Sequence, residues 1–198
     1  MKGNAFVLGI SGMPGSGKGT FINICEKKGG KVFRMGNEVR KEVKKRKLTL
    51  TPENVGRIAN EMREKHGSEI WAQRTLQSIK SWLEREGSKG EFIIIDGIRS
   101  IDEVNFFKKH FSAFILLSLH ASPSLRWRRM KERRRSDDFP TEKMFLERDE
   151  RELKWGIGEV IALSDEIISN NGSLEELERK AEEFFSQLKE GKVQYYNI

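Results

Sequence analysis

The stretch Gly9–Phe21, GISGMPGSGKGTF, contains five glycines, one proline and one lysine, and it contains no acidic residue. The overlapping residues Ala5–Ile10 are almost all apolar and predict a buried strand. Inside the stretch, Gly12–Lys18 fits the spacing G-x-x-x-x-G-K, and a helix is predicted to begin at Lys18. A strand, a glycine-rich loop and a helix in this order predict a loop whose backbone N–H groups surround phosphate.

The loop has the chemistry that a phosphate chain requires. Glycine at positions 15 and 17 permits backbone angles that other residues exclude. The helix adds the positive end of its dipole, and its lysine adds a full charge for the outer phosphates. A glycine-rich turn without a ligand is the alternative. We expect nucleotide binding by Gly12, Met13, Pro14, Gly15, Ser16, Gly17, Lys18, Gly19 and Thr20, with Lys18 also catalytic in phosphoryl transfer.

Positive charge is concentrated in two short segments of the chain. The protein has 198 residues and a net charge of +7. Arg40–Lys47 holds six basic residues and one acidic residue, and Arg126–Arg135 holds seven basic residues and one acidic residue. Segments of this kind attract phosphate groups, either on a small molecule or on a nucleic acid. Solvated helix faces would explain the same residues.

Length and composition limit the class of protein. We expect residues 1–198 to form one domain, because this length suits a single hydrophobic core. No apolar run approaches the roughly 20 residues of a membrane helix, and we expect no signal peptide at the N-terminus. Cys25 is the single cysteine, so we expect neither an internal disulfide nor a cysteine-based metal site. A cytoplasmic protein without a membrane partner is the expectation.

Strands and helices are predicted to alternate along the chain. Apolar runs predict strands over residues 5–11, 31–34, 91–97, 111–119 and 165–171. Helical patterns cover residues 18–27, 37–86, 101–110 and 123–155. Ser173 and Glu176 predict a capping box before a final helix. Strands that are apolar throughout and are joined by helices predict a parallel sheet covered on both faces.

The glycine loop resembles that of a known class of kinases. Pro14–Thr20, PGSGKGT, is similar to the phosphate-binding loop of adenylate kinases. Most P-loops carry Ser or Thr directly after the lysine to ligate magnesium, whereas Gly19 occupies that position here. In adenylate kinases Mg²⁺ is held mostly by phosphate oxygens and waters. The resemblance implies ATP and Mg²⁺ as cofactors, and a small-molecule kinase rather than a GTPase or a motor ATPase.

The segment Met35–Val43, MGNEVRKEV, resembles the T-G-D-x-x-R motif of nucleoside-monophosphate kinases. Gly36 and Arg40 match this motif, whereas Met35 and Asn37 depart from it. In that family the arginine binds the phosphate of the acceptor. The resemblance therefore implies that Gly36 and Arg40 bind the acceptor.

The segment Ile93–Ser100, IIIDGIRS, resembles the family motif h-h-h-D-G-F-P-R. It is one residue shorter than the motif and lacks the proline. The resemblance implies that Asp96 holds magnesium through water, and Thr20 is the second expected metal-binding residue. It also implies that Arg99 binds the acceptor phosphate.

We expect a lid in the region that contains the second basic segment. Arg135–Asp138, RSDD, resembles the R-x-D-D motif of the kinase lid, and Arg148 would be the arginine that follows this motif. Arg126, Arg129 and Arg133 share one face of a predicted helix. We expect these residues to converge with Arg135 and Arg148 on the transferring phosphoryl group, and we assign catalytic roles to Arg129, Arg135 and Arg148.

The C-terminal part resembles a different kinase. Ser164–Leu177, SDEIISNNGSLEEL, is similar to a segment of dephospho-coenzyme A kinases that lies beside the donor adenine. The resemblance implies that Asn170, Asn171 and Gly172 contact the base of the nucleotide. A strand, a turn and a capped helix would explain the same residues without a ligand.

Taken together, the motifs resemble adenylate-kinase-related P-loop kinases, including a group of archaeal proteins. The resemblance implies an α/β fold of the P-loop NTPase type, with three α/β/α layers and a five-stranded parallel sheet in the order 2-3-1-4-5. It implies a helical acceptor-binding region over about 36–86 and a short helical lid over about 123–150. The implied activity is transfer of the γ-phosphoryl group of ATP to a nucleoside monophosphate or dephospho-coenzyme A.

Two other functions fit the same sequence. A nucleic-acid-associated P-loop ATPase would use the basic segment 126–135, in which Trp127 lies among arginines and is able to stack on a base. Nucleic acid is the less favoured partner, because no known RNA-binding module is recognised in the sequence. A regulator that binds nucleotide without turnover is the other alternative. The sequence does not decide the oligomeric state.

Overall fold

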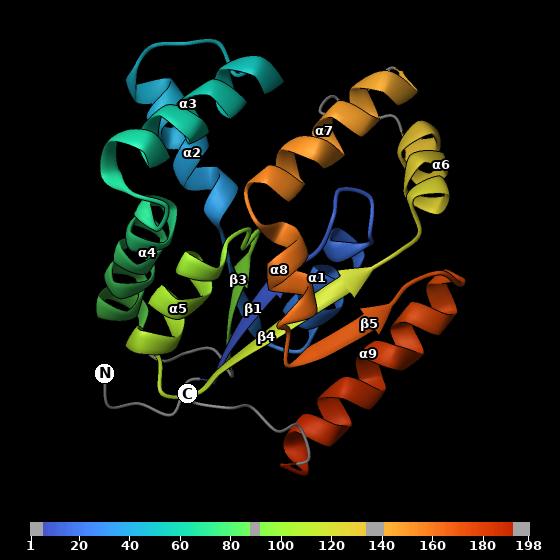
Figure 1. Ribbon diagram of the computed structural model, residues 1–198. Coiled ribbons are helices and arrows are strands. Elements are labelled where there is room, and N and C mark those ends of the chain that lie inside the picture. The colour runs from blue at the N-terminus through green and yellow to red at the C-terminus, as the bar shows by residue number, and fades with distance from the viewer. Residues whose placement is uncertain (1–5, 88–91, 134–140, 192–198) are drawn as a thin grey trace.

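The computed structural model describes residues 6–87, 92–133 and 141–191. Within them, five strands form one parallel sheet: β1 (Phe6–Ser11), β2 (Gly30–Arg34), β3 (Phe92–Asp96), β4 (Phe114–His120) and β5 (Glu166–Ser169). Their order across the sheet is β2-β3-β1-β4-β5 (Figure 1). The predicted fold class and strand order are therefore confirmed.

Strand side chains alternate between the two faces of the sheet. Val7 of β1 lies opposite Ile93 of β3, and both belong to one buried apolar cluster. The next pair, Leu8 and Ile94, belongs to a second buried cluster on the other face. The strands are apolar throughout because helices cover both faces.

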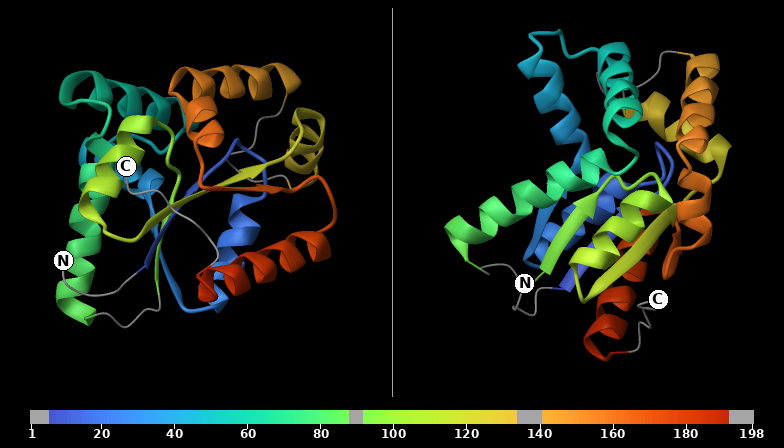
Figure 2. Two further views of the ribbon diagram at one scale, coloured as in Figure 1. Left: turned by 60° about the horizontal axis from the view of Figure 1, so that its bottom comes forward. Right: turned by 60° about the vertical axis from the view of Figure 1, so that its left-hand side comes forward.

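Helices complete the three layers that Figure 2 shows in its left view. One face of the sheet is covered by α4 (Ile70–Glu86), α5 (Ile101–His110) and α8 (Ile157–Ala162). The other face is covered by α1 (Lys18–Lys27) and α9 (Leu174–Lys189), where Phe21 stacks on Phe185 with ring centroids 6.4 Å apart.

Two pairs of helices stand above the carboxyl ends of the strands (Figure 1). One pair is α2 (Met35–Lys45) and α3 (Pro52–His66), and the other pair is α6 (Pro123–Arg133) and α7 (Glu142–Lys154). Every strand of a parallel sheet ends at the same edge, and open α/β sheets bind their ligands there. The glycine loop that follows β1 lies at this edge, so the fold places the predicted site between the two pairs.

Several helices differ from the sequence prediction. The helical region 37–86 divides into three helices, because the chain turns at Lys47, with φ 56°, and at Gly67, with φ 93°. Helix α8 was not predicted. Ser173 caps α9 by accepting from Glu176 N, but the Glu176 carboxylate pairs with Lys180 instead of closing the capping box. No helix in the described part of the chain is both long and apolar enough to cross a membrane.

Candidate active site

The loop between β1 and α1 is packed so tightly that only glycine fits at key positions. Gly12 has φ 138°, and a Cβ there would lie 2.3 Å from Leu119 O. Gly17 has φ 100°, and a Cβ there would lie 2.1 Å from Asn170 Nδ2. Gly15 also has a positive φ, of 81°. The glycines therefore allow the loop to curve and to pack closely against β4 and the turn after β5.

Polar donors inside the loop are available to an anion. The Ser16 hydroxyl is buried and, within the described residues, has no hydrogen-bond partner. Lys18 Nζ bends back to the loop, where it donates to Gly12 O and, at 3.1 Å, to Met13 O. A buried hydroxyl without a partner costs stability, and phosphate oxygens would accept from it and from the lysine. These residues therefore fit the phosphates of a nucleotide.

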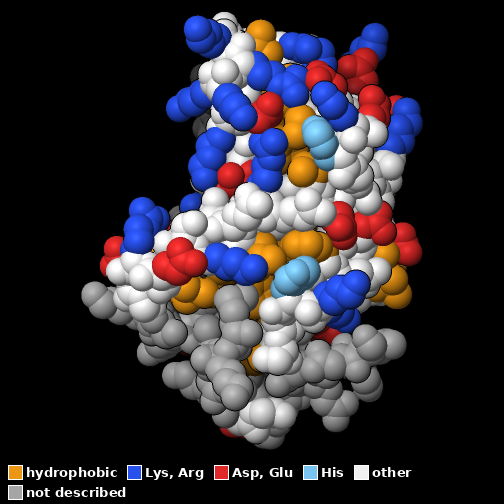
Figure 3. Space-filling model, turned by 90° about the vertical axis from the view of Figure 1, so that its left-hand side faces the viewer, with side chains coloured by type: hydrophobic (Ala, Val, Ile, Leu, Met, Phe, Trp, Pro, Cys, Tyr) orange, Lys and Arg blue, Asp and Glu red, His pale blue; other side chains and the backbone are white. Residues whose placement is uncertain are grey.

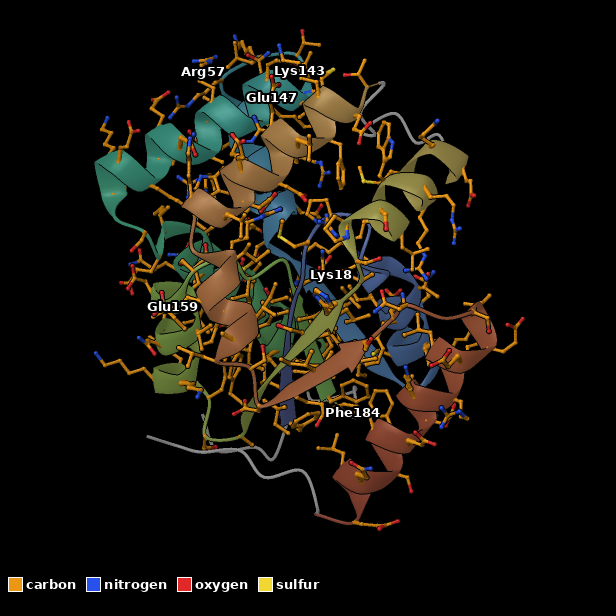
Figure 4. The ribbon with its side chains drawn as sticks, turned by 45° about the vertical axis from the view of Figure 1, so that its right-hand side comes forward. Lys18, Arg57, Lys143, Glu147, Glu159 and Phe184 are labelled. Atoms are coloured by element: carbon orange, nitrogen blue, oxygen red, sulfur yellow. The ribbon has the colours of Figure 1, made fainter. Side chains whose placement is uncertain are left out.

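Lys18 lies at the centre of the molecule, at the carboxyl end of the sheet (Figure 4). Burial lowers the pKa of its ammonium group to about 8, although the carboxylates of Asp96 and Glu152 act in the opposite direction. A bound anion would restore the preference of this lysine for its charged form. A phosphate in the loop would therefore stabilise the charged form of Lys18.

Asp96, predicted to hold magnesium through water, ends β3 directly beside Ile10 of β1. Its carboxylate is 3.8 Å from Nε of Arg34, which ends the edge strand β2. Thr20, the other predicted metal-binding residue, is partly exposed on the first turn of α1. The structure places both residues at the edge of the sheet where the loop lies, and their role toward magnesium stays a prediction.

A cluster of arginines surrounds Trp155 at the end of α7. The guanidinium carbons of Arg63, Arg99 and Arg148 lie 4.9, 5.5 and 5.6 Å from the centroid of its ring. These arginines come from α3, from the loop after β3 and from α7. The indole nitrogen of Trp155 donates to Asn60 Oδ1 on α3 at 2.8 Å, which fixes the ring. The cluster therefore joins three separate elements.

Two buried carboxylates hold the arginines of this cluster. Glu152 accepts from Arg99 Nε at 2.6 Å, and its other oxygen is 2.5 Å from Arg148 Nη2. Burial by itself raises the pKa of Glu152, but the charges of Arg99, Arg148 and Lys18 outweigh this effect and lower the pKa below its usual range. Glu103 accepts from Arg99 N at 2.7 Å and lies 3.4 Å from Arg63 Nη2. Ser11 Oγ donates to Ile98 O at 2.8 Å, so the segment that carries Arg99 of this cluster adjoins the glycine loop.

Arg126 differs from the expectation that it faces the transferring group. Its side chain is only 3% exposed and makes two hydrogen bonds to the Asp149 carboxylate of α7, at 2.9 and 2.5 Å. It also donates to Pro14 O in the glycine loop at 3.0 Å and to Ala121 O at 3.2 Å. Arg126 therefore ties α6, α7 and the loop together.

The turn over residues 170–172, predicted to contact the base, is itself bonded to the loop. Asn170 Nδ2 donates to Ser16 O at 2.9 Å, and Asn171 Oδ1 accepts from Ser122 N at 2.9 Å. Arg129 donates to Asn170 O at 2.8 Å and to Gly172 O at 3.1 Å. These contacts give Asn170, Asn171 and Arg129 structural roles. Contact of the turn with a base, and of Arg129 with a phosphoryl group, stay predictions.

The remaining predicted residues lie on α2 or outside the described residues. Gly36 and Arg40 are on α2, where Arg40 is exposed and its guanidinium is 3.4 Å from Asn37 Oδ1. Arg135 and the rest of the RSDD segment fall within residues 134–140, outside the described part of the chain. Their roles as acceptor and lid residues stay predictions.

The basic segment 40–47 borders a groove away from the glycine loop. Lys41 and Lys45 line a groove of about 700 Å³ between β2, α2 and α4. Arg46 does not line this groove, and it bonds to Glu42 at 2.9 Å and to Glu61 at 2.7 Å. On the face that includes α2 and α3, lysine and arginine side chains gather over the upper part of the molecule (Figure 3).

Comparison with known proteins places the chain in a family. A family model described as an AAA domain matches residues 11–144. A UPF0200 protein of Methanocaldococcus jannaschii is 44% identical over 170 residues, which are 86% of this chain and 84% of that protein. A UPF0200 protein of Hyperthermus butylicus is 40% identical over 182 residues, 92% of this chain and 94% of that protein. The chain belongs to the UPF0200 family.

Solved structures of similar fold include kinases. The protein TT1252 from Thermus thermophilus has a TM-score of 0.66 at 19% identity, covering 94% of this UPF0200 chain and 99% of that chain. Shikimate kinase from Acinetobacter baumannii, in complex with shikimate, has a TM-score of 0.58 at 15% identity, with coverage of 96% and 97%. A sugar kinase from Janibacter has a TM-score of 0.54 at 16% identity, with coverage of 97% and 99%. This UPF0200 protein therefore has a P-loop kinase-like fold.

Most residues of the cluster in this UPF0200 protein carry no recognisable motif in the sequence. Asn60 and Arg63 lie in the helical region that matched no motif, and Glu152 and Trp155 follow a run of alternating charges. Such a run is typical of a solvated helix. One sequence pattern does indicate the cluster. The spacing of Arg148, Glu152 and Trp155 puts all three residues on one side of a helix.

Proposed function

We propose that this protein is an ATP-dependent kinase that transfers the γ-phosphoryl group of ATP to a nucleotide-like acceptor, such as a nucleoside monophosphate or dephospho-coenzyme A. The observation that supports this most is the meeting of two sets of donors. Within the described residues, the glycine loop offers Lys18 and a Ser16 hydroxyl without a hydrogen-bond partner, and the segment carrying Arg99 of the arginine cluster adjoins this loop. The shikimate kinase and the sugar kinase of similar fold agree with this proposal.

The residues of the chain would act by positioning and by neutralising charge. ATP with Mg²⁺ supplies the transferable phosphoryl group, and phosphoryl transfer needs little covalent chemistry from the protein. The loop amides, Ser16 and Lys18 would bind the donor phosphates, while Asp96 would hold magnesium through water and Thr20 would be the second metal-binding residue. Arg148 would face the group in transfer, and Arg99 would bind the acceptor phosphate. We place the reaction in the cytoplasm, where ATP is supplied.

The test is a screen of acceptors with radiolabelled ATP and Mg²⁺. We expect label on one class of phosphorylated acceptor, and we expect Lys18→Ala to lower the rate by at least about 100-fold, because electrostatic groups at a reacting centre contribute this much. The variant should keep its circular dichroism spectrum and melting temperature. Undiminished transfer by Lys18→Ala would refute the site, and failure to label any acceptor would refute the kinase.

A nucleic-acid-associated ATPase is the second candidate. The lysines and arginines that gather over α2 and α3 favour it, since exposed positive charge binds phosphate backbones (Figure 3). The same assay separates the two candidates when ATP hydrolysis is measured with and without RNA. Strong stimulation by RNA without labelling of a small acceptor would support the ATPase. A bound nucleotide that is never turned over would support a regulator.

A further inference from the structure

The arginine cluster carries more positive charge than its own carboxylates balance. Arg63, Arg99, Arg148 and Arg151 bring four guanidinium groups, and Glu103 and Glu152 bring two carboxylates. Lys18 and Asp96 both interact electrostatically with Arg99, and their opposite charges cancel in this sum. The excess of two positive charges equals the charge of a phosphomonoester dianion.

Two arginines of the cluster have donors without partners. Within the described residues, Arg63 Nη1 and Arg151 Nε are buried and donate to no hydrogen-bond acceptor. Arg63 belongs to α3 and lies against Trp155 at the end of α7, whereas Arg151 belongs to α7 and reaches toward Gly56 of α3. The unpaired donors therefore lie on both sides of the seam between α3 and α7. Buried donors of this kind are costly unless a ligand satisfies them.

We propose that Arg63 and Arg151 bind a phosphate group of the acceptor in the seam between α3 and α7, so that the acceptors of this enzyme are phosphate esters. This inference rests on the proposed function, because it assigns the acceptor side of that same site. Arginine suits this role, since its planar fork binds phosphate through two hydrogen bonds. A neutral sugar alcohol would leave the excess charge unbalanced and the donors unpaired.

The first test measures binding without catalysis. Tryptophan fluorescence is titrated with pyrophosphate, with adenosine monophosphate and with shikimate, and Trp155→Phe identifies the signal of Trp155. We expect both phosphate compounds to change the Trp155 signal, and we expect Arg63→Gln and Arg151→Gln each to weaken this binding by roughly 10-fold or more, as loss of a charged hydrogen bond does. The response should persist in Lys18→Ala.

The matched control is Arg57→Gln. Arg57 is an exposed arginine on the same helix α3, and its partners are Asn54 and Glu61 on that helix. Figure 4 shows it at the top of the molecule, away from Lys18. We expect this variant to bind as the unchanged protein does. Arg63→Lys, which keeps the charge beside Glu103, serves if Arg63→Gln does not fold, and it should bind with intermediate affinity.

Three outcomes would overturn the inference. Binding that is lost in Lys18→Ala but kept in Arg63→Gln and Arg151→Gln would place the anion in the glycine loop alone. If shikimate bound as tightly as the phosphate compounds, the site would accept carboxylates in general and would not select phosphate esters. If Arg57→Gln weakened phosphate binding as much as Arg63→Gln and Arg151→Gln do, the effect would come from general surface charge. A different result separates this inference from the proposed function. If no acceptor is phosphorylated but Arg63→Gln and Arg151→Gln still weaken phosphate binding, the kinase proposal fails and the phosphate site stands.

Discussion

Gly17 and Gly19 lie two residues apart in the glycine loop, but their surroundings are opposite. A Cβ at Gly17 would meet Asn170 Nδ2 at 2.1 Å and would sit on a residue with φ 100°, whereas a Cβ at Gly19 would have no atom within 4 Å. Gly19 also lies in the first turn of α1, where alanine is the better helix former. The two glycines therefore serve different purposes.

We expect Gly17→Ala to destabilise the protein by about 1–3 kcal/mol, because an alanine is strained in this conformation and must displace Asn170 from Ser16 O. Gly19→Ala should stabilise it by about 0.5–1 kcal/mol. Urea unfolding followed by circular dichroism measures both changes. A Gly17→Ala variant as stable as the natural protein would show that the loop is not seated on Asn170.

At the scale of elements, the buried Arg126 is the point where α6, α7 and the glycine loop meet. Its guanidinium bonds to Asp149 of α7 and to Pro14 O of the loop. Removal of one partner from a buried ion pair leaves the other charge uncompensated, so we expect Arg126→Gln to cost about 3–5 kcal/mol. Arg128→Gln is the matched control, since Arg128 is exposed on the same helix and its loss should change stability by about 0.5 kcal/mol at most.

Thermal unfolding of the two variants gives this comparison directly. If Arg126→Gln melted at the same temperature as Arg128→Gln, the ion pair with Asp149 would not hold α6 and α7 together. The measurement also bears on the lid, because Arg126 was expected to face the transferring group and is instead buried against Asp149. If a kinase assay is run at a temperature where Arg126→Gln is still folded, we expect any loss of activity to come from a displaced glycine loop. It would not come from the loss of a catalytic charge.

Local patterns made the sheet and the loop predictable. The apolar runs before Ser11 and Asp96 are typical of buried parallel strands, and the glycine spacing around Lys18 is a local property of the chain. The cluster was not predictable in this way, because Arg63 and Glu152 are 89 residues apart in sequence and meet only through the packing of α3 beside α7. Helix α8 was missed since its six residues are too few to show a period.

At the scale of the whole molecule, one edge of the sheet collects the charges of distant segments. The glycine loop, Asp96, the arginines around Trp155 and the turn after β5 all lie where the parallel strands end, between the two pairs of helices that stand above the sheet (Figure 1). Lys18 is half-buried there, and its desolvation lowers its pKa to about 8. This arrangement supports the account that the edge binds two phosphate compounds side by side, the donor in the loop and the acceptor in the seam.

The most direct test of this account is an NMR titration of the isotope-labelled protein with ATP and Mg²⁺. We expect the largest shifts at the backbone amides of residues 12–20, because these N–H groups would surround the phosphates of the donor. Lys18→Ala, titrated in the same way, should need a much higher ATP concentration for the same shifts. Amides of residues 12–20 that do not move at saturating ATP would contradict the account.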